Sequence, residues 1–598
     1  MNAQEIRDRI IATVMKNGGH LASSLGAVEI AMALRKVFDP EKDRILWDVG
    51  HQAYAWKLLT GREDRFDTLR QLDGLAPFPT PLESKADAAV SGHAGSAFSV
   101  AVGLAAARDL KGTDESVVAV VGDASMANGH SFEALNNCAA ATKKLILVLN
   151  DNEMSISRPV GAFAKFLGRM LASEGYNRVK LAAESTGHRM KLTFLREAYH
   201  RLESRVKGLF LGNRFFEQFG LRYIGPVDGH DLKALEAAFA VAKRDKRSVL
   251  VHVVTVKGKG YEPAEKDPTK YHGVPAGGKV DLPPRDAVVN RPDWSEGFGH
   301  LLVELAREDD RVVAITAGMK TGTGLEEFAR EFPHRFFDVG IAEGHMVSFA
   351  AGLAANGMRP FVAVYSTFLQ RAVDQVIHDV ALAKLPVVFC VDRAGVVGAD
   401  GATHHGTFDL ALLGAIPNLA ICQPCSGMDF KLMLEDALKR PGPTVIRYPR
   451  GIMPAPMNVV GGELSVPVAN VASPVQLWTT GDELPKAMAV AAKCGCGVVY
   501  ARYLKPLDEA LLARQLADGK RIWTLEDGVV RGGFGAALRD AAAGGGAATG
   551  RIRSFGWPDE FIPHGKVAEL ERRYGLDVDA IAAEITGSLE QFEPTNNS

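Results

Sequence analysis

The sequence predicts an α/β protein built from three doubly wound, mostly parallel sheets. Its 598 residues exceed what a single hydrophobic core normally serves, so several domains are expected. Apolar runs of strand length alternate with helix-length segments in three successive blocks, a pattern typical of sheets covered by helices on both faces. Ligands of such sheets bind at the carboxyl ends of the strands, so polar residues at those ends are the first candidates for function.

Stretches rich in Pro and Gly divide the chain into domains. We predict a first domain over residues 1–290, with a polar, helical insertion at about 158–219 and a linker at 261–290. A second domain is predicted over residues 291–455 and a third over residues 470–598. The third domain carries few polar groups that could converge on a site.

The second and third blocks repeat the alternation of strand and helix. The second block opens with a predicted helix at Trp294–Glu308, and a linker at 451–474 separates it from the third block. The strands expected in these two blocks are residues 312–316, 360–364, 386–392, 419–422, 497–502 and 521–525.

The first block contains two apolar runs that each end on polar residues. Residues 117–124 end on Gly-Asp-Ala, and residues 145–152 end on Asn-Asp-Asn. The segment 131–141 between them predicts a helix, and a right-handed crossover would bring both polar ends to one edge of a sheet. Mg²⁺ prefers hard oxygen ligands and usually takes one or two from side chains together with phosphate oxygens. The pattern therefore indicates a metal–diphosphate clamp, while a purely structural role stays open because turns favour the same residues.

Composition and charge argue against several classes of protein. The formal net charge is −2 with both signs mixed along the chain, so neither a nucleic acid nor a membrane is expected as a partner. No apolar stretch approaches the roughly 18 residues that span a bilayer, and residues 1–16 lack the apolar core of a signal peptide. The cytoplasm is therefore the expected location. A nicotinamide-dependent dehydrogenase is disfavoured, because no Gly-x-Gly-x-x-Gly lies between a strand and a helix.

Six cysteines in so long a chain do not indicate a disulfide framework. Two pairs, Cys422-x-x-Cys425 and Cys494-x-Cys496, could suggest zinc or redox chemistry. A Cys-x-Cys pair matches the usual zinc-ligand spacing poorly, so we interpret all of them as ordinary reduced cysteines.

Several longer strings resemble the family of 1-deoxy-D-xylulose-5-phosphate synthases. Trp-Asp-Val-Gly-His-Gln-Ala-Tyr at 47–54 is one of them, and Asn-Asp-Asn-Glu-Met-Ser-Ile-Ser at 150–157 is another. The likeness extends from about Gly18 to Pro563, and the long strings distinguish this family from transketolase and pyruvate dehydrogenase. The remaining matching strings are residues 225–230, 260–268, 365–371, 392–395, 398–404 and 447–451.

The resemblance implies an enzyme, a transketolase-like transferase. It would condense pyruvate with D-glyceraldehyde 3-phosphate, release CO₂ and form 1-deoxy-D-xylulose 5-phosphate, a precursor for isoprenoids and thiamine. Its implied cofactors are thiamine diphosphate and Mg²⁺, and its implied assembly is a homodimer. The first domain would bind the diphosphate and Mg²⁺, the second the pyrimidine ring, and the third would be the transketolase-like C-terminal domain. Two alternatives remain: a related ketol-transferring or 2-oxo acid enzyme, and a degenerate paralogue that binds the cofactor without turnover.

The resemblance also assigns roles in cofactor binding. Glu343, in the string Ile-Ala-Glu-Gly-His, would transfer a proton at the pyrimidine ring, and Phe368 would pack on that ring. Three departures from the family pattern concern this region: Ala124 where the family usually has glycine, Ser-Gly-His-Ala-Gly-Ser at 91–96 in place of a string richer in hydroxyls, and Gly344 in place of glutamine. The implied cofactor-binding residues are Gly122, Asp123, Ala124, Asn152, His93, Phe368, Lys257 and Glu343, with Asp123, Asn152 and Met154 at the metal.

A second set of residues is implied at the substrates. His51 and His404 would handle protons near pH 7, since a neutral imidazole can give or take one. Arg393 and Arg450 would hold the phosphate of glyceraldehyde 3-phosphate with their guanidinium groups. Arg371 belongs near the pocket without an assigned role. The implied catalytic residues are Glu343, His51, His404 and Asp400, and the implied substrate-binding residues are Tyr365, Arg393, Arg450, His272 and Asp400.

Overall fold

The computed structural model describes residues 1–152, 161–163, 165–166, 211–278, 291–455, 463–546 and 549–590. The chain divides into two compact units: unit 1 comprises Met1–Arg70 and Gly74–Asp281, and unit 2 comprises Gln71–Asp73 and Leu282–Ser598. Most of the insertion predicted at about 158–219 lies outside the described residues. Among the described helices, none combines the length and apolar character needed to cross a membrane.

Unit 1 contains one parallel sheet of five strands in the order β1-β2-β3-β5-β4. The two predicted strands with polar ends are neighbours in it, and the helix predicted between them is present as α7 (Gly129–Ala141). The strands are β1 (Arg44–Trp47), β2 (Val117–Gly122), β3 (Ile146–Asp151), β4 (Arg222–Asp228) and β5 (Val249–Val254).

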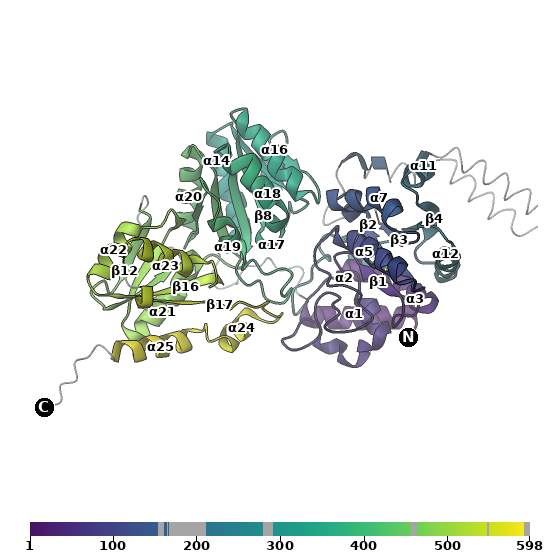
Figure 1. Ribbon diagram of the computed structural model, residues 1–598, viewed down its shortest axis with the longest axis horizontal. Helices are drawn as coiled ribbons and strands as arrows, with labels where there is room; N and C mark the ends of the chain where they lie inside the picture. Colours follow the sequence, from purple (N-terminus) through teal and green to yellow (C-terminus); the bar gives the residue numbers. More distant parts are fainter. Residues whose placement is uncertain are drawn as a thin grey trace, which may run out of the picture. The chain divides into compact units, whose positions relative to one another are not determined.

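The alternation of side chains along these strands creates a core on each face of the sheet. Val118 and Val120 of β2 pack into one core with helices α1, α3 and α12, whereas Val117 and Ala119 pack into the other with α5 and α7. Figure 1 shows α5 and α7 on one side of the sheet and α1 and α3 on the other. The helices of the unit are α1 (Ala3–Asn17), α2 (Leu21–Gly26), α3 (Val28–Val37), α4 (Tyr54–Lys57), α5 (Ser96–Lys111), α6 (Asp123–Met126), α7, α11 (Leu211–Gln218), α12 (Leu232–Arg244) and α13 (Glu262–Lys266).

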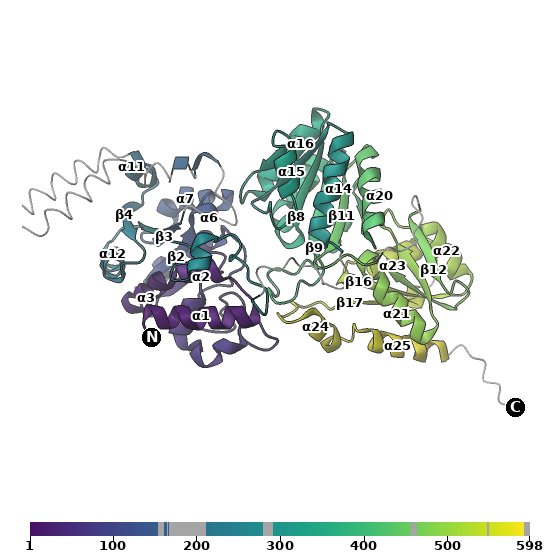
Figure 2. The same ribbon diagram turned by 180° about the vertical axis from the view of Figure 1, so that it is seen from behind.

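Unit 2 contains two sheets, and the first has seven strands in the order β15-β10-β11-β9-β8-β6-β7. Its pairs are parallel except for β15, which is antiparallel to β10 and comes from the third block of the sequence. The strands are β6 (Val312–Thr316), β7 (Phe336–Asp338), β8 (Arg359–Tyr365), β9 (Val388–Ala394), β10 (Ala420–Cys422), β11 (Thr444–Pro449) and β15 (Tyr503–Lys505). Its helices, several of them visible in Figure 2, are α14 (Trp294–Glu308), α15 (Glu326–Glu331), α16 (Glu343–Ala355), α17 (Ser366–Leu369), α18 (Val373–Gln375), α19 (Asp409–Gly414) and α20 (Gly427–Lys439).

The second sheet of unit 2 has the order β12-β14-β13-β16-β17, with β12 antiparallel at one edge. Strand β12 lies within the stretch 451–474 that the sequence predicted as a linker. Its Pro467 explains the difference, since Pro is tolerated on edge strands yet makes a short strand look like a loop. The elements are β12 (Ser465–Ala469), β13 (Val475–Thr479), β14 (Gly497–Ala501), β16 (Arg521–Val529), β17 (Ile552–Trp557), α21 (Leu484–Cys494), α22 (Glu509–Ala517), α23 (Phe534–Gly544), α24 (Val567–Arg573) and α25 (Val578–Glu590).

One hydrophobic core serves both sheets of unit 2. Ile315 and Val364 from the seven-stranded sheet lie in the same buried cluster as Trp478 and Ile522 from the five-stranded sheet. This shared core, together with the crossing of β15, explains why the second and third blocks form one unit. The predicted fold class, with three mostly parallel sheets, is confirmed, while the domain boundaries stay a prediction.

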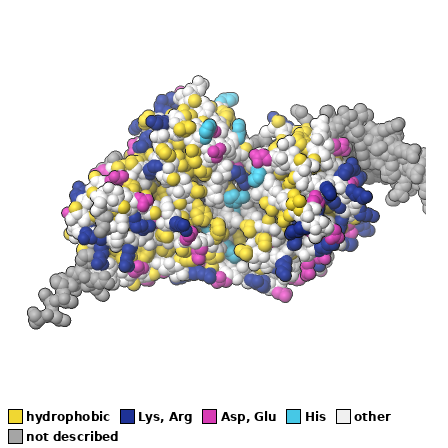
Figure 3. Space-filling model, in the orientation of Figure 1, with side chains coloured by type: hydrophobic (Ala, Val, Ile, Leu, Met, Phe, Trp, Pro, Cys, Tyr) yellow, Lys and Arg dark blue, Asp and Glu magenta, His cyan; other side chains and the backbone are white. Residues whose placement is uncertain are grey.

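The surface agrees with a formal net charge of −2. On the face shown in Figure 3, Lys and Arg side chains are interspersed with Asp and Glu over both units. A mixed surface of this kind is typical of ordinary globular proteins.

Candidate active site

The two predicted halves of the clamp meet at the carboxyl edge of the unit 1 sheet. Gly122 at the end of β2 lies opposite Asn150 of β3 in the parallel ladder. Asp123 and Ala124 begin helix α6 directly after β2, and Asn152 follows the last residue of β3. Met154, the third predicted metal ligand, lies outside the described residues.

Asp123 carries a buried carboxyl group, with 7% of the residue exposed. Burial, together with the negative charge of Asp151, raises the pKa of Asp123 to about 7 against the opposing effect of Lys257. Burial also lowers the pKa of the Lys257 ammonium to about 8. Two neighbouring carboxylates and a carboxamide offer hard oxygens, and a bound divalent cation would stabilise the ionised form of Asp123. These residues therefore fit Mg²⁺ by their chemistry.

A buried hydrogen-bonded chain holds the end of β3 in place. His252 Nε2 lies 3.0 Å from Asp151 Oδ2, and His252 Nδ1 lies 2.7 Å from the hydroxyl of Tyr223. Asn150, the residue before Asp151, is held as well, because Thr255 Oγ1 donates a hydrogen bond to Asn150 Oδ1 at 2.7 Å. Contacts of this kind fix the orientation of residues that ligate a metal.

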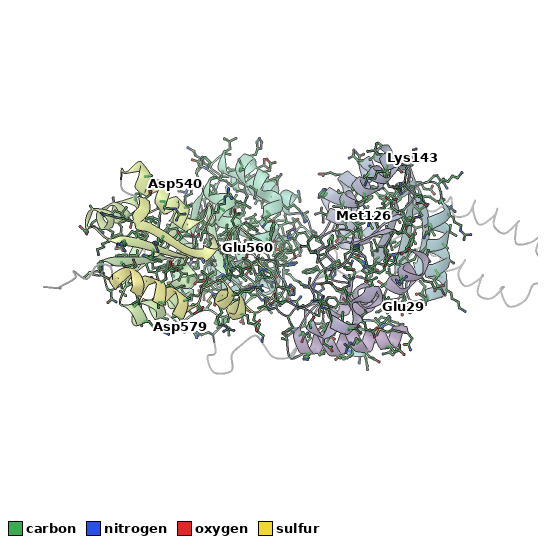
Figure 4. The ribbon with its side chains drawn as sticks, turned by 60° about the horizontal axis from the view of Figure 1, so that its bottom comes forward. Glu29, Met126, Lys143, Asp540, Glu560 and Asp579 are labelled. Atoms are coloured by element: carbon green, nitrogen blue, oxygen red, sulfur yellow. The ribbon has the colours of Figure 1, made fainter. Side chains whose placement is uncertain are left out.

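A second network holds the segment that carries Lys257. His230 Nε2 accepts a hydrogen bond from the backbone N–H of Val256 at 2.8 Å, and His230 Nδ1 lies 3.1 Å from Glu29 Oε2. Glu29, labelled on α3 in Figure 4, also accepts from Arg7 Nη2 at 2.8 Å. The end of β5 is thus tied to α1 and α3 on the face of the sheet that they cover.

The loop with His93 is positioned by Asp48, the residue after β1. The carboxylate of Asp48 accepts hydrogen bonds from the backbone N–H groups of Gly95 at 2.9 Å and Ala97 at 3.0 Å, at the start of α5. Gly95 has φ = +83°, and a Cβ there would lie 2.6 Å from Asn128 Oδ1. Glycine is therefore required at this position within the string 91–96.

Three histidines of unit 1 lie together, and sequence reasoning identified two of them. The ring centroids of His51 and His272 are 5.4 Å apart, and His20 completes the group at 5.8 Å from His51 and 5.5 Å from His272. His20 was missed because a lone histidine carries no pattern. The signal that could have found it is Gly18-Gly19 directly before it, since a Cβ at Gly19 would lie 2.8 Å from the Tyr54 hydroxyl.

Glu343 is the first residue of α16, at the carboxyl end of the seven-stranded sheet in unit 2. It is 3% exposed, and Arg371 Nη1 donates to its two carboxylate oxygens at 3.2 Å and 3.4 Å. The guanidinium thereby fixes the direction of the carboxylate at the start of the helix. The structure thus places Arg371 beside Glu343, a contact that the sequence did not predict. A Cβ at Gly344 would lie 3.3 Å from Gln375 Oε1, so the Gln375 amide lies beside the glycine that replaces the family's glutamine.

An aromatic and cationic stack follows β8 and β9. The rings of Tyr365 and Phe368 are stacked with centroids 5.8 Å apart, and the Arg393 guanidinium lies 3.9 Å from the centroid of the Tyr365 ring. His404 meets Phe368 edge-on at 5.6 Å. Arg393, the penultimate residue of β9, has φ = +60°, a strained value for a residue with a side chain. Sequence-predicted Tyr365, Phe368, Arg393 and His404 are therefore brought together.

Arg450 and Asp400 form the outer part of this cluster. Arg450 Nη1 lies 3.6 Å from Asp400 Oδ2, and the side chain of Arg450 is 51% exposed. The neighbouring histidines make separate contacts: His404 Nδ1 lies 3.0 Å from Thr403 Oγ1, while His405 Nδ1 accepts from the backbone N–H of Val397. Burial lowers the pKa of His405 to about 4, so its ring is neutral and structural.

Three segments of the chain match known protein families. Residues 1–255 match the family described as 1-deoxy-D-xylulose-5-phosphate synthase, residues 290–456 the pyrimidine binding domain of transketolase, and residues 466–581 the C-terminal domain of transketolase. The 1-deoxy-D-xylulose-5-phosphate synthase of Desulforudis audaxviator is 46% identical over 594 residues, which cover 97% of this chain and 93% of that protein. That of Pelotomaculum thermopropionicum is 45% identical and covers 99% and 94%. A solved transketolase from Campylobacter jejuni is 18% identical with a TM-score of 0.44, over 98% of each chain.

Proposed function

The chain belongs to the 1-deoxy-D-xylulose-5-phosphate synthase family, a group of transketolase-like transferases, and from that premise we propose its substrates and the roles of its residues. Pyruvate and D-glyceraldehyde 3-phosphate are condensed with loss of CO₂ to 1-deoxy-D-xylulose 5-phosphate. When bound, thiamine diphosphate supplies the carbon nucleophile and the electron sink for this chemistry. The observation that carries the proposal is the buried Glu343, held by Arg371 at the start of α16.

Asp123 and Asn152 would hold Mg²⁺, and Gly122, Ala124, His93 and Lys257 would lie along the diphosphate. The buried ammonium of Lys257 suits a diphosphate because each charge-assisted bond is stronger than a neutral one. Asp151 would support this site indirectly, through its negative charge and through its contact with His252. The residues that would hold the diphosphate and metal thus lie in unit 1.

Glu343 would exchange a proton with the pyrimidine ring nitrogen, and Phe368 would pack against that ring. The contact with Arg371 fixes the direction of the Glu343 carboxylate. His51 and His404 would give or take protons at the substrate oxygens, and within unit 1 His272 and His20 lie beside His51. Glu343 and Phe368, which would act on the pyrimidine ring, both lie in unit 2.

Arg393 and Arg450 would bind the phosphate of glyceraldehyde 3-phosphate, with the Tyr365 hydroxyl beside them. Arg393 is fixed by its stacking on Tyr365, whereas Arg450 is half exposed and its Nη1 lies 3.6 Å from Asp400 Oδ2. An exposed guanidinium is accessible to an incoming anion. Asp400 would then turn to a substrate hydroxyl.

Replacing Arg450 with alanine is expected to raise the KM for glyceraldehyde 3-phosphate by about 10- to 100-fold, because the variant loses one charge-assisted hydrogen bond to the phosphate. The KM for pyruvate should change much less, because pyruvate has no phosphate. Steady-state kinetics with each substrate varied in turn measure both values. The exposed Arg330, replaced by alanine in the same unit, serves as the control and should leave both unchanged. An equal rise for the two substrates would remove Arg450 from the phosphate site.

Release of CO₂ from pyruvate by the purified protein tests the function as a whole. We expect release that depends on added thiamine diphosphate and Mg²⁺, that rises with glyceraldehyde 3-phosphate, and that stops with a chelator of divalent cations. Full turnover without the phosphorylated aldehyde would instead indicate a related 2-oxo acid enzyme. Cofactor binding without any product would indicate a degenerate paralogue. Sedimentation at several protein concentrations tests the homodimer that we also propose, and fractionation of cells tests the cytoplasmic location.

A further inference from the structure

The two cysteine pairs noted in the sequence differ sharply in their surroundings. Cys422 and Cys425 are fully buried, as are Cys138 and Cys390. Cys494 is the only one of the six cysteines, all of which lie within the described residues, that is partly exposed. It ends helix α21, and the buried Cys496 comes two residues later, directly before β14. The pair thus combines one thiol that a solute can reach with one that it cannot.

The chain between these two cysteines is a tight turn. Gly495 adopts the left-handed conformation with φ = +72°, and its N–H bonds back to the carbonyl of Ala491 to end the helix. Two trans peptide steps keep the Cα atoms of the pair within about 7.6 Å even when extended, and the turn brings them closer. Disulfides bridge Cα separations of about 4.4–6.8 Å, so two cysteines at this spacing can come within the range that a bridge requires.

Each of the two thiols shifts the pKa of the other. A hydrogen bond from Cys496 lowers the pKa of the Cys494 thiol, assisted by backbone N–H groups, and the same bond raises the pKa of Cys496. The carboxyl end of α21 opposes a thiolate at Cys494, so the hydrogen bonds are what favour it. Cys494 therefore has the character of an attacking thiol, with Cys496 as the thiol that resolves the product.

We propose that Cys494 and Cys496 are a site of reversible oxidation, at which a peroxide converts the two thiols to an intramolecular disulfide. The Cys494 thiolate attacks one peroxide oxygen, the O–O bond breaks, and the departing oxygen leaves as water after taking a proton. This step makes a sulfenic acid at Cys494. The Cys496 sulfur then attacks the Cys494 sulfur, the S–O bond breaks, and a second water leaves. Two thiols are oxidised and one hydrogen peroxide is reduced to two waters, and a dithiol reductant reverses the change.

The Cys422-x-x-Cys425 pair provides an internal comparison of the same chemistry in a different environment. Burial raises the pKa of both thiols, that of Cys425 to about 12, and Cys422 Sγ donates to the carbonyl oxygen of Val445 at 3.5 Å. A buried, protonated thiol is a poor nucleophile. The pair with the spacing more often linked to redox chemistry is therefore expected to be inert.

Oxidation would act locally in the five-stranded sheet and its helices. Lys493, beside the pair, forms an ion pair with Asp579 of α25, which is labelled in Figure 4. The carbonyl of Cys496 accepts from Asn470 Nδ2 at 3.1 Å, next to the edge strand β12. These contacts lie outside the residues placed in the active site, so neither variant below should alter basal synthase activity.

Treatment of the folded, full-length protein with hydrogen peroxide tests the proposal. Free thiols are then blocked with N-ethylmaleimide under denaturing conditions, and the protein is digested with trypsin. Cleavage after Lys493 and Arg502 yields one peptide that contains both Cys494 and Cys496. We expect this peptide to lose two hydrogen atoms and to escape the label at low peroxide, and to regain both labels after dithiothreitol. The peptide with Cys422 and Cys425 should stay fully labelled.

Two variants separate the roles of the pair. Cys496→Ser should stop the reaction at a sulfenic acid on Cys494, which dimedone captures. Cys494→Ser should leave Cys496 reduced at the same peroxide dose. The proposal is overturned if the 494–502 peptide keeps both labels under peroxide that oxidises a free thiol standard. It is equally overturned if Cys422 and Cys425 are oxidised first, or if Cys496 oxidises without Cys494.

Discussion

Replacing Glu343 with glutamine should lower the turnover of the enzyme by about 10²–10⁴-fold, the usual contribution of a positioned acid–base group. Glutamine keeps the size of the side chain and can still contact Arg371, but it cannot exchange a proton. The buried position at the start of α16 means that no water easily takes its place. Release of CO₂ from pyruvate gives the rate, and calorimetric titration with thiamine diphosphate and Mg²⁺ shows whether the cofactor still binds.

Glu326 provides the matched control for that experiment. It is also the first residue of a helix in unit 2, α15. Unlike Glu343 it is exposed, and it accepts a hydrogen bond from the hydroxyl of Thr321. Glu326→Gln should leave turnover and binding unchanged. A Glu343→Gln enzyme that binds the cofactor, melts at the wild-type temperature and turns over at a near-normal rate would contradict the role assigned to Glu343.

Replacing Arg447 with methionine should destabilise unit 2 by about 3–5 kcal/mol, the usual cost of leaving buried charges without their partner. Its guanidinium donates to both carboxylate oxygens of Asp409, at 2.9 Å and 3.1 Å, and to Asp527 at 2.6 Å. Arg447 is 1% exposed, and it joins β11 of the seven-stranded sheet to β16 of the five-stranded one. For a unit of this size each kcal/mol lowers Tm by about 2–4 °C, so a fall of about 10 °C is expected in calorimetry.

An exposed ion pair of the same kind is the control. Arg307 contacts Glu331 through two hydrogen bonds of 2.7 Å each, but both side chains face water. Arg307→Met should therefore leave Tm almost unchanged, because solvent screens the pair in the wild type. Equal falls in Tm for the two variants would show that the buried Arg447 network adds no more stability than an exposed ion pair.

Local patterns predicted most of the fold. The strand at 312–316 and the helix at Trp294–Glu308 were placed from apolar spacing alone, and both occur with those bounds. The edge strands were harder. Strand β12 contains Pro467 and pairs on one side only, and β15 joins a sheet formed earlier in the sequence. Edge strands have weak apolar patterns because they bury less, so their partners cannot be read from sequence.

The same limit applies to the candidate site. The spacing of Asp123 and Asn152 predicted that they would share one edge, because a crossover has only one common hand. The contact between Asp151 and His252 joins residues 101 positions apart, and the pairing of Glu343 with Arg371 depends on how α16 lies beside the segment after β8. Such contacts follow from the packing of whole elements, which no short motif contains.

Strand β15 comes from the third block but pairs within the seven-stranded sheet. This pairing limits how the second and third blocks can be exchanged by recombination. Strand β15 pairs with β10, and Lys505, the last residue of β15, donates through Nζ to the carbonyls of Gly414 and Ile416. A recombination event that exchanged only the segment after residue 455 would have to bring back a strand of matching register, or leave backbone donors and acceptors open to another molecule. The two blocks are therefore expected to be inherited together, as a single heritable module.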